Sequence, residues 1–220
     1  MIVLDNDVST EGMVGTVTQN GGNVRVGQIG ILYQLYKAGT ALANSTPETS
    51  LLTPANVPPQ LVGNMAQSAT TTSVPIPALP AGWFALGTQI RGKLFGTIAN
   101  TGTPTLRVRV VLKNSAGTVV YTLADTTAIA TVTITGTTEL EVNFDSIVSA
   151  VGTTGSVTSR ASFLYSSTLA SGSAPLRIGA AAAAVTVDTT QAYSLDVLAT
   201  WGAASASNTL NISIGSIEVL

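Results

Sequence analysis

The chain has 220 residues and a formal net charge of −2 at pH 7; 45% of the residues are hydrophobic, 9% are charged, and none is Cys or His. The hydrophobic content argues against a disordered chain, and the absence of Cys excludes disulfides and thiolate metal sites. Without His, the commonest general base and transition-metal ligand is missing, so we expect no catalytic site, no bound metal and no cofactor.

The sequence also gives no sign of nucleic-acid binding, membrane insertion or secretion. Phosphate neutralisation needs clustered Lys and Arg, which the chain lacks. No apolar run approaches the roughly 20 residues of a membrane-spanning helix. Asp5 and Asp7 follow the first residues too closely for a secretory signal. We therefore expect a protein that is neither secreted nor transmembrane.

Residues 1–45 predict an N-terminal arm or appendage, because they hold too little apolar mass for a core of their own. Asp5, Asp7 and Glu11 are spaced like the acids of a calcium loop, but the turn glycine of an EF-hand is missing. Alternating acids on the wet face of an extended arm explain the pattern more simply. A calcium site remains the alternative.

Within the arm, residues 31–37 have two interpretations. Apolar residues four apart, such as Ile31 and Leu35, predict a short helix. The same segment alternates equally well as a strand, and Gly27 and Gly30 weaken the start of a helix. We predict the helix, with the strand as the alternative.

Residues 46–220 predict an antiparallel, jelly-roll-like β-sandwich. Strand and turn signals recur at short intervals, and no amphipathic helix intervenes. In the clearest run, TELEVNFD, the side chains of Leu140, Val142 and Phe144 point one way and polar side chains the other. Further alternating apolar residues are Ile90 and Leu94, then Leu106, Val108, Val110 and Leu112, and then Val119, Tyr121 and Leu123 after a turn at residues 114–117. These patterns favour an all-β sandwich over a fold of parallel strands and helices.

The last run of the chain, NTLNISIGSIEVL, changes the phase of its alternation. Its apolar residues are Leu210, Ile212 and Ile214 on one parity and Ile217 and Val219 on the other. One inserted residue would return all five side chains to a single face. We therefore predict a strand that is built into a sheet, with a β-bulge at Gly215 or Ser216.

The charged residues of the predicted strands offer two alternatives. Arg107 and Arg109 could pair across strands with Glu139 and Glu141, at no more than about 1 kcal/mol per pair. The two glutamates could also meet the spacing of a glycosidase carboxylate pair. A solvated strand face explains these charges more simply, so we predict no catalytic residues.

Three large aromatic residues lie near predicted loops or strand ends, namely Trp83, Phe84 and Trp201. Exposed rings of this kind could form a platform that stacks on a sugar. In a chain with so few aromatic residues, we interpret them as core or subunit-interface residues instead.

Several stretches of the sequence resemble a known family. They are, in order, TPETSLL, GTQIRGKLFGTIANTGTPTLRVRVVL, RASFLYSS and AAVTVDTTQAYSLDVLATWGAASASNTLNISIGSIEVL. Their order and spacing resemble the jelly-roll-like domains of virion structural proteins of tailed bacteriophages, which occur as decoration or cement proteins on heads and on tails or fibres. The resemblance covers roughly residues 46–220; the arm and residues 56–73 depart from it.

The resemblance implies a non-enzymatic capsid decoration or cement protein, located in the virion and bound to the major capsid protein. The alternative is a head-fibre, tail-fibre or receptor-binding module that recognises a host surface glycan. The arm would be the attachment element, because its apolar residues need a partner surface. These residues are Ile2, Val3, Leu4, Met13, Val14 and Val17.

The resemblance also commonly implies trimers. Strand faces with small residues and few charges are poor at keeping a monomer alone in water, so we predict a homotrimer formed mainly by the β domain. The small residues in question are Ala161 and Ser162 and residues 180–184 and 203–206.

Overall fold

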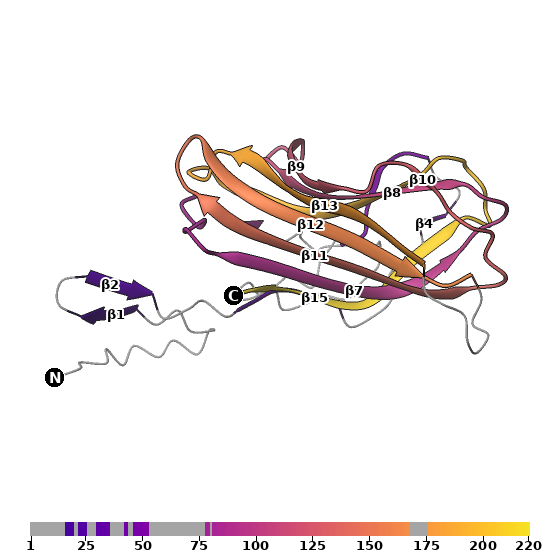
Figure 1. Cartoon of the computed structure of the whole chain (residues 1–220), viewed down its shortest axis with the longest axis horizontal. Helices are drawn as coiled ribbons and strands as arrows, with labels where there is room; N and C mark the ends of the chain where they lie inside the picture. The colour runs from indigo at the N-terminus through magenta and orange to yellow at the C-terminus, as the bar shows by residue number, and fades with distance from the viewer. Residues whose placement is uncertain are drawn as a thin grey trace.

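The computed structural model describes residues 16–19, 22–25, 30–35, 42–43, 46–52, 78–79, 81–167 and 176–220, and of residues 16–35 it describes the backbone. Over this part of the chain the protein is all-β, with two antiparallel sheets packed face to face and one separate hairpin (Figure 1). The predicted β-sandwich is therefore confirmed. No helix in the described ranges is long and apolar enough to cross a lipid bilayer.

The larger sheet includes the last strand of the chain and two strands from its N-terminal segment. Its strands are β3 (Gly30–Leu35), β4 (Leu42–Ala43), β7 (Gln89–Ala99), β11 (Thr138–Ala150), β12 (Gly155–Tyr165), β13 (Leu176–Val187) and β15 (Thr209–Val219). Their order across the sheet is β13–β12–β11–β7–β15–β3, and β4 also pairs with β15. The C-terminal strand thus lies inside the sheet, between β7 and strands from the N-terminal segment.

The smaller sheet is built around its two long central strands. Its members are β5 (Thr49–Ser50), β6 (Ala78–Leu79), β8 (Thr105–Lys113), β9 (Val119–Asp125), β10 (Ile129–Ala130) and β14 (Tyr193–Trp201). Strand β8 pairs with β14, with β9 and β10 on the far side of β8 and with β5 and β6 on the far side of β14. The separate hairpin consists of β1 (Thr16–Gln19) and β2 (Gly22–Arg25).

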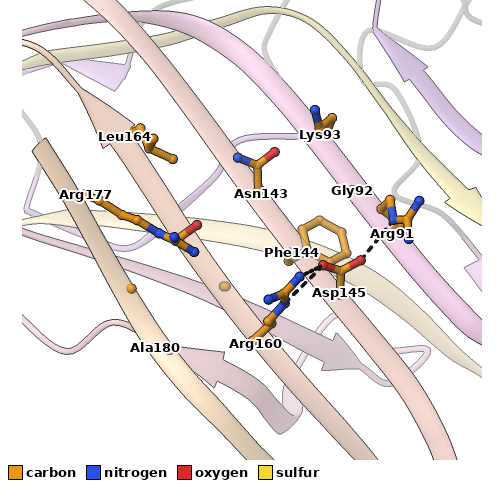
Figure 2. Close-up of a pocket in the computed structure, with 13 residues that line it drawn as sticks. Arg91, Gly92, Lys93, Asn143, Phe144, Asp145, Arg160, Leu164, Arg177 and Ala180 are labelled. Carbon is orange, nitrogen blue, oxygen red and sulfur yellow. Dashed lines mark hydrogen bonds and ion pairs between the residues drawn. The ribbon is translucent and has the colours of Figure 1, made fainter. Parts of the chain in front are cut away.

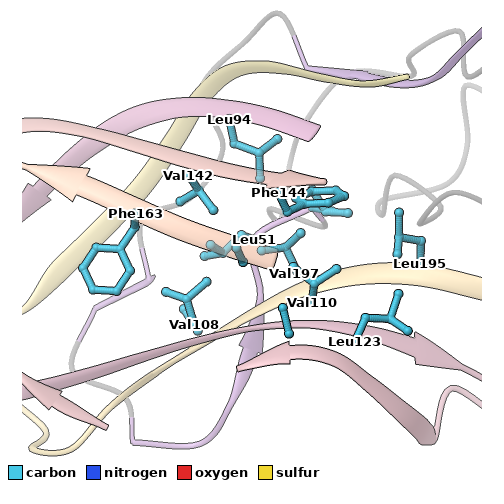
Figure 3. Close-up of a cluster of buried hydrophobic side chains, with 14 of the residues drawn as sticks. Leu51, Leu94, Val108, Val110, Leu123, Val142, Phe144, Phe163, Leu195 and Val197 are labelled. Atoms are coloured by element: carbon cyan, nitrogen blue, oxygen red, sulfur yellow. The ribbon is translucent and has the colours of Figure 1, made fainter. Parts of the chain in front are cut away.

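Alternation along the strands separates a wet face from the core. On β11, Asn143 and Asp145 face outward (Figure 2), whereas Val142 and Phe144 are buried between the sheets (Figure 3). Side chains of the smaller sheet, such as Val197, meet them from the opposite side. Full burial of one such side chain stabilises the fold by roughly 1.5–3 kcal/mol, so the inward positions fix the register of each strand.

The predicted apolar faces agree with the structure in the long central strands. Leu140, Val142 and Phe144 are buried, and so are the predicted inward residues of β8, which are Leu106, Val108, Val110 and Leu112. The predicted turn that follows β8 closes with a hydrogen bond of 2.9 Å from the Gly117 N–H to the carbonyl oxygen of Asn114. Gly117 has a φ of 76°, which a glycine adopts without strain.

The helix predicted over residues 31–37 is wrong. Residues Gly30–Leu35 form β3, which pairs antiparallel with β15. Short segments have little helical stability of their own, so the hydrogen bonds offered by the open edge of β15 decide the conformation. The alternating pattern, which was the alternative interpretation, is the one that the fold uses.

The predicted bulge in β15 exists, but it lies at Ser213 rather than at Gly215 or Ser216. Ile212 pairs with Gly96 and Ile214 with Phe95, which leaves Ser213 as the extra residue. Ile214 is consequently turned outward and is 53% exposed, against the expectation that it shares the buried face of the other four apolar residues. Beyond the bulge the strand continues to Val219, and the N–H of the next residue, Leu220, donates to the Gln89 carbonyl oxygen at 2.9 Å.

The position of the bulge follows from the glycine that faces it. A Cβ added at Gly96 would lie 1.8 Å from the carbonyl oxygen of Asn211, so no side chain fits between β7 and β15 at this point. A bulge bends its strand towards or away from the neighbour, and here the bend is possible only because the neighbour has no side chain.

We expect Gly96→Ala to lower the free energy of unfolding by about 2 kcal/mol or more, because the backbone of β15 must move. Gly179→Ala is the matched control, since its Cβ would meet no atom closer than 3.3 Å. That variant should change the free energy of unfolding by less than about 1 kcal/mol. Chemical denaturation measures both, and equal losses would contradict the close approach at Gly96.

Candidate functional site

A hollow of about 460 Å³ lies on the outer face of the seven-stranded sheet, over β7, β11, β12 and β13. Four cationic side chains line it, namely Arg91, Lys93, Arg160 and Arg177. One carboxylate, Asp145, and one amide, Asn143, lie between them (Figure 2). The lining is therefore rich in positive charge and in hydrogen-bond donors.

Strand register brings these charges together. Asp145 of β11 lies opposite Arg91 of β7 on one side and Arg160 of β12 on the other. Glu218 of β15 lies opposite Arg91, so four neighbouring strands carry charges of alternating sign in one row. Opposite charges on directly facing positions stabilise antiparallel pairs.

Asp145 is the centre of this row. Its Oδ1 accepts a hydrogen bond of 3.0 Å from the Arg91 Nε, and its Oδ2 accepts one of 2.9 Å from the Arg160 Nη2. Partial burial pushes the pKa of Asp145 up, but hydrogen bonds from Arg160 and Arg91, together with their charges, outweigh burial and leave the pKa below its usual value. The carboxylate therefore stays ionised at neutral pH.

Two cations of the hollow are less strongly engaged. The Lys93 Nζ lies 3.9 Å from Glu141 Oε1 and 5.9 Å from the centroid of the Phe95 ring. Arg177 makes no ion pair with any residue that the structure describes. Figure 2 shows its side chain running from β13 over β12. Both groups are thus available to an anionic partner.

Asn143 adds an unpaired acceptor. Its Nδ2 donates to Glu141 Oε1 at 2.8 Å, while its buried Oδ1 accepts no hydrogen bond from the described part of the chain. A buried acceptor without a donor costs free energy, and this oxygen has almost no exposed surface at which an incoming group could reach it. The hollow therefore offers an anion its cationic donors.

A second polar cluster, on the smaller sheet, is a structural connection. Asp196 is fully buried and accepts hydrogen bonds of 2.6 Å from both the Lys113 Nζ and the Ser50 Oγ. Burial raises the pKa of Asp196 although these partners act against it. The cluster fastens the segment around β5 to β14, and its carboxylate is closed to solvent.

The arginines of the smaller sheet find partners other than those considered from the sequence. Arg107 pairs with Asp125 and Arg109 with Glu48, with Nε–O distances of 2.9 and 2.7 Å respectively. Glu139 and Glu141 instead lie on the outer face of β11 in the other sheet. The suggested pairs between these arginines and glutamates are therefore wrong.

The three predicted aromatic residues do not form an exposed platform. Trp201 and Phe84 are buried, at 0% and 4% exposure. Trp83 is half-buried and packs edge-on against Phe84 with a centroid separation of 5.6 Å. The faces of Phe84 and Trp201 are closed to a sugar in this conformation.

The attachment residues predicted in the arm lie largely beyond the part that the structure describes. Ile2, Val3, Leu4, Met13 and Val14, and the acids Asp5, Asp7 and Glu11, are outside the described residues, and Val17 belongs to β1, of which the backbone is described. Within the described ranges, no cluster of three or more His, Cys, Asp or Glu side chains could hold a metal ion. The alternative of a calcium site at Asp5, Asp7 and Glu11 therefore stays untested.

The sequence did not single out the hollow. Arg91 and Lys93 stand at alternate positions of a predicted strand, which indicates one wet face and no more. The pairing of β11 with β12 and of β12 with β13 brings Arg160 and Arg177 to the same surface, and no local pattern shows that pairing. Comparison with protein-family models, curated proteins and solved structures gives no significant match for the chain.

We expect Asp145→Asn to lower the free energy of unfolding at pH 7 by no more than about 1 kcal/mol, because the side chains of its partners Arg91 and Arg160 are 47% and 63% exposed. The lowered pKa means that the ionised carboxylate stabilises the fold above its unfolded pKa of about 3.9. This contribution is lost as the pH falls through the lower pKa of the folded state.

The difference between Asp145→Asn and the unmodified protein should accordingly shrink towards zero below about pH 4. Urea denaturation at several pH values measures it. Glu139→Gln, which removes an exposed carboxylate with no ion pair among the described residues, is the control and should have little effect at pH 7. A difference that grows on acidification would contradict the assignment.

Proposed function

We propose that this protein is a non-enzymatic structural subunit of a tailed-phage virion, a capsid decoration or cement protein with a jelly-roll-like body. It would bind the major capsid protein at neighbouring positions of the shell. The observation that carries the proposal is the attachment of the N-terminal segment: β3 is paired along β15, while β1 and β2 pair with each other. A segment that is fastened to the body at one end can hold a neighbour with the other.

The fastening has a clear physical basis. Positions Leu35 to Gly30 of β3 lie opposite positions Gly215 to Val219 of β15, so a ladder of backbone hydrogen bonds anchors the segment. Each such bond contributes about 0.5–1.5 kcal/mol net. Figure 1 shows the β1–β2 hairpin beyond the end of the sandwich at which β15 finishes. This arrangement supports a body with a projecting attachment element.

The chemistry of the chain supports a structural role. It contains no His and no Cys, the residues most often used as general base, metal ligand or activated nucleophile. Asp196, the buried acid of the smaller sheet, is enclosed by Lys113 and Ser50. A cement protein needs stability and contact area rather than a reactive group.

We expect virions of the phage that encodes the chain to contain hundreds of copies, as a protein spread over a shell requires. Quantitative mass spectrometry of purified virions gives the number. Tens of copies would favour the head-fibre, tail-fibre or receptor-binding alternative. Absence from virions would overturn the proposal.

Deletion of residues 1–20 should leave the sandwich folded, because β3 and β4 remain, but should abolish binding to shells that lack the protein. Circular dichroism checks folding, and sedimentation with empty shells checks binding. Full occupancy by the truncated protein would place the binding surface on the β body instead.

We also propose a homotrimer. Strand β13 has one unpaired edge among the described strands, and its residues 182–184 are exposed alanines. Ala161 and Ser162 are buried, however, so they contribute nothing to such a surface. Light scattering at micromolar concentration should give three times the chain mass of 22.3 kDa. A monomer would contradict this expectation.

A further inference from the structure

We propose that the cationic hollow receives the acidic start of the N-terminal arm, residues 2–11, from a second copy of the chain. The inference rests on the proposed role of the arm as an attachment element and names the surface that it grips. The evenly spaced acids of the arm would bind the spare cations of the seven-stranded sheet.

The two partners have complementary charge. Before Arg25 the chain contains the acids Asp5, Asp7 and Glu11 and no Lys or Arg. The hollow has four cationic side chains and one carboxylate in its lining. In an extended segment Asp5 and Asp7 point to the same side at a spacing of about 7 Å, so both can face one surface.

The hollow has cations to spare for these acids. Arg91 and Arg160 are held by Asp145, which leaves Arg177 without an ion pair among the described residues and Lys93 at 3.9 Å from its nearest carboxylate oxygen. The planar guanidinium of Arg177 can bind a carboxylate through two parallel hydrogen bonds. An ammonium such as that of Lys93 suits a single oxygen.

The remaining contacts suit a peptide. Leu164 lines the hollow, and Phe95 and Ile214 lie on the same outer face with 36% and 53% exposure. These side chains offer apolar contact to the Ile-Val-Leu stretch that precedes Asp5.

A second copy is the favoured source of the segment. The chain enters β1 at Thr16, and Figure 1 shows the β1–β2 hairpin away from the sandwich. Glu11 is five positions before Thr16, at most about 18 Å of extended chain. Tethered to this hairpin, the acidic stretch can reach the same hollow of a neighbouring copy.

Because the chain has no Cys, engineered cysteines can report the contact cleanly. Full-length Ser9→Cys, whose side chain shares the side of Asp5 and Asp7 in an extended arm, is mixed with full-length Leu164→Cys under mild oxidation, and disulfide-linked pairs are measured on a non-reducing gel. We expect linked pairs to form at least tenfold faster than with Val120→Cys, an exposed position on the smaller sheet. A chain that carries both cysteines tests docking within one copy.

Charge variants test the chemistry of the contact. Arg177→Gln should slow cross-linking, whereas Arg107→Gln, the same change on the other sheet, should not. Lys93→Glu with Arg177→Glu in the hollow should reduce the rate at least tenfold, and Asp5→Lys with Asp7→Lys in the arm should do the same. A copy with Asp5→Lys and Asp7→Lys in the arm, mixed with a copy with Lys93→Glu and Arg177→Glu in the hollow, should cross-link at the original rate. This double reversal of charge would not restore cross-linking if either variant were misfolded.

Four results would overturn the inference: equal rates for Leu164→Cys and Val120→Cys, insensitivity to the charge variants, no restoration by the double reversal, or linkage only within one chain. Binding of polygalacturonate to the hollow without any cross-link would point to an acidic glycan instead. Cross-linking without binding to shells would contradict the proposed cement role and leave the contact between arm and hollow standing. Binding to shells without cross-linking would contradict the contact between arm and hollow and leave the cement role standing.

Discussion

The pairing of β15 with β7 on one side and with β3 on the other is the constraint on which the rest of the structure depends. It joins the last strand of the chain to the centre of the larger sheet and to the N-terminal segment. The fit at this seam needs Gly96, since the carbonyl oxygen of Asn211 occupies the space of a side chain. The bulge at Ser213 then divides the strand, with Ile212 and Ile217 inward and Ile214 outward. The close contact between Gly96 and Asn211 thus determines which isoleucines of β15 enter the core and which one lies on the outer surface.

Electrostatics on the outer face has one organising group, Asp145. It ties three strands together through Arg91 and Arg160, and each arginine is more than 40% exposed, so the energetic contribution of the row is small. Its larger effect is on geometry, because it fixes two long side chains on either side of the hollow. Lys93 and Arg177, which flank this row, keep their charge available. Arg91 and Arg160 are therefore held in place by Asp145, whereas Lys93 and Arg177 can bind an anionic partner.

The sequence predicted those parts of the fold that depend on strand alternation. Leu140, Val142 and Phe144 were assigned to the core because their period of two is local information. The helix predicted over residues 31–37 was wrong, since the strand that Gly30–Leu35 form depends on an edge of β15 far along the chain. The bulge was predicted from a phase change, but its position depends on Gly96 of another strand. The hollow needs the register of β7, β11, β12 and β13 together, which no single stretch contains.

The two sides of β11 give the molecule separable properties. Its even positions, among them Val142 and Phe144, fill the core, and its odd positions, among them Asn143 and Asp145, form the outer surface. A change at an even position alters stability and leaves the charge of the surface intact. A change at an odd position alters binding capacity at little cost to the fold. Because adjacent residues of β11 face the core and the solvent in turn, substitutions on the outer face can change which partner binds there while the sandwich keeps its fold.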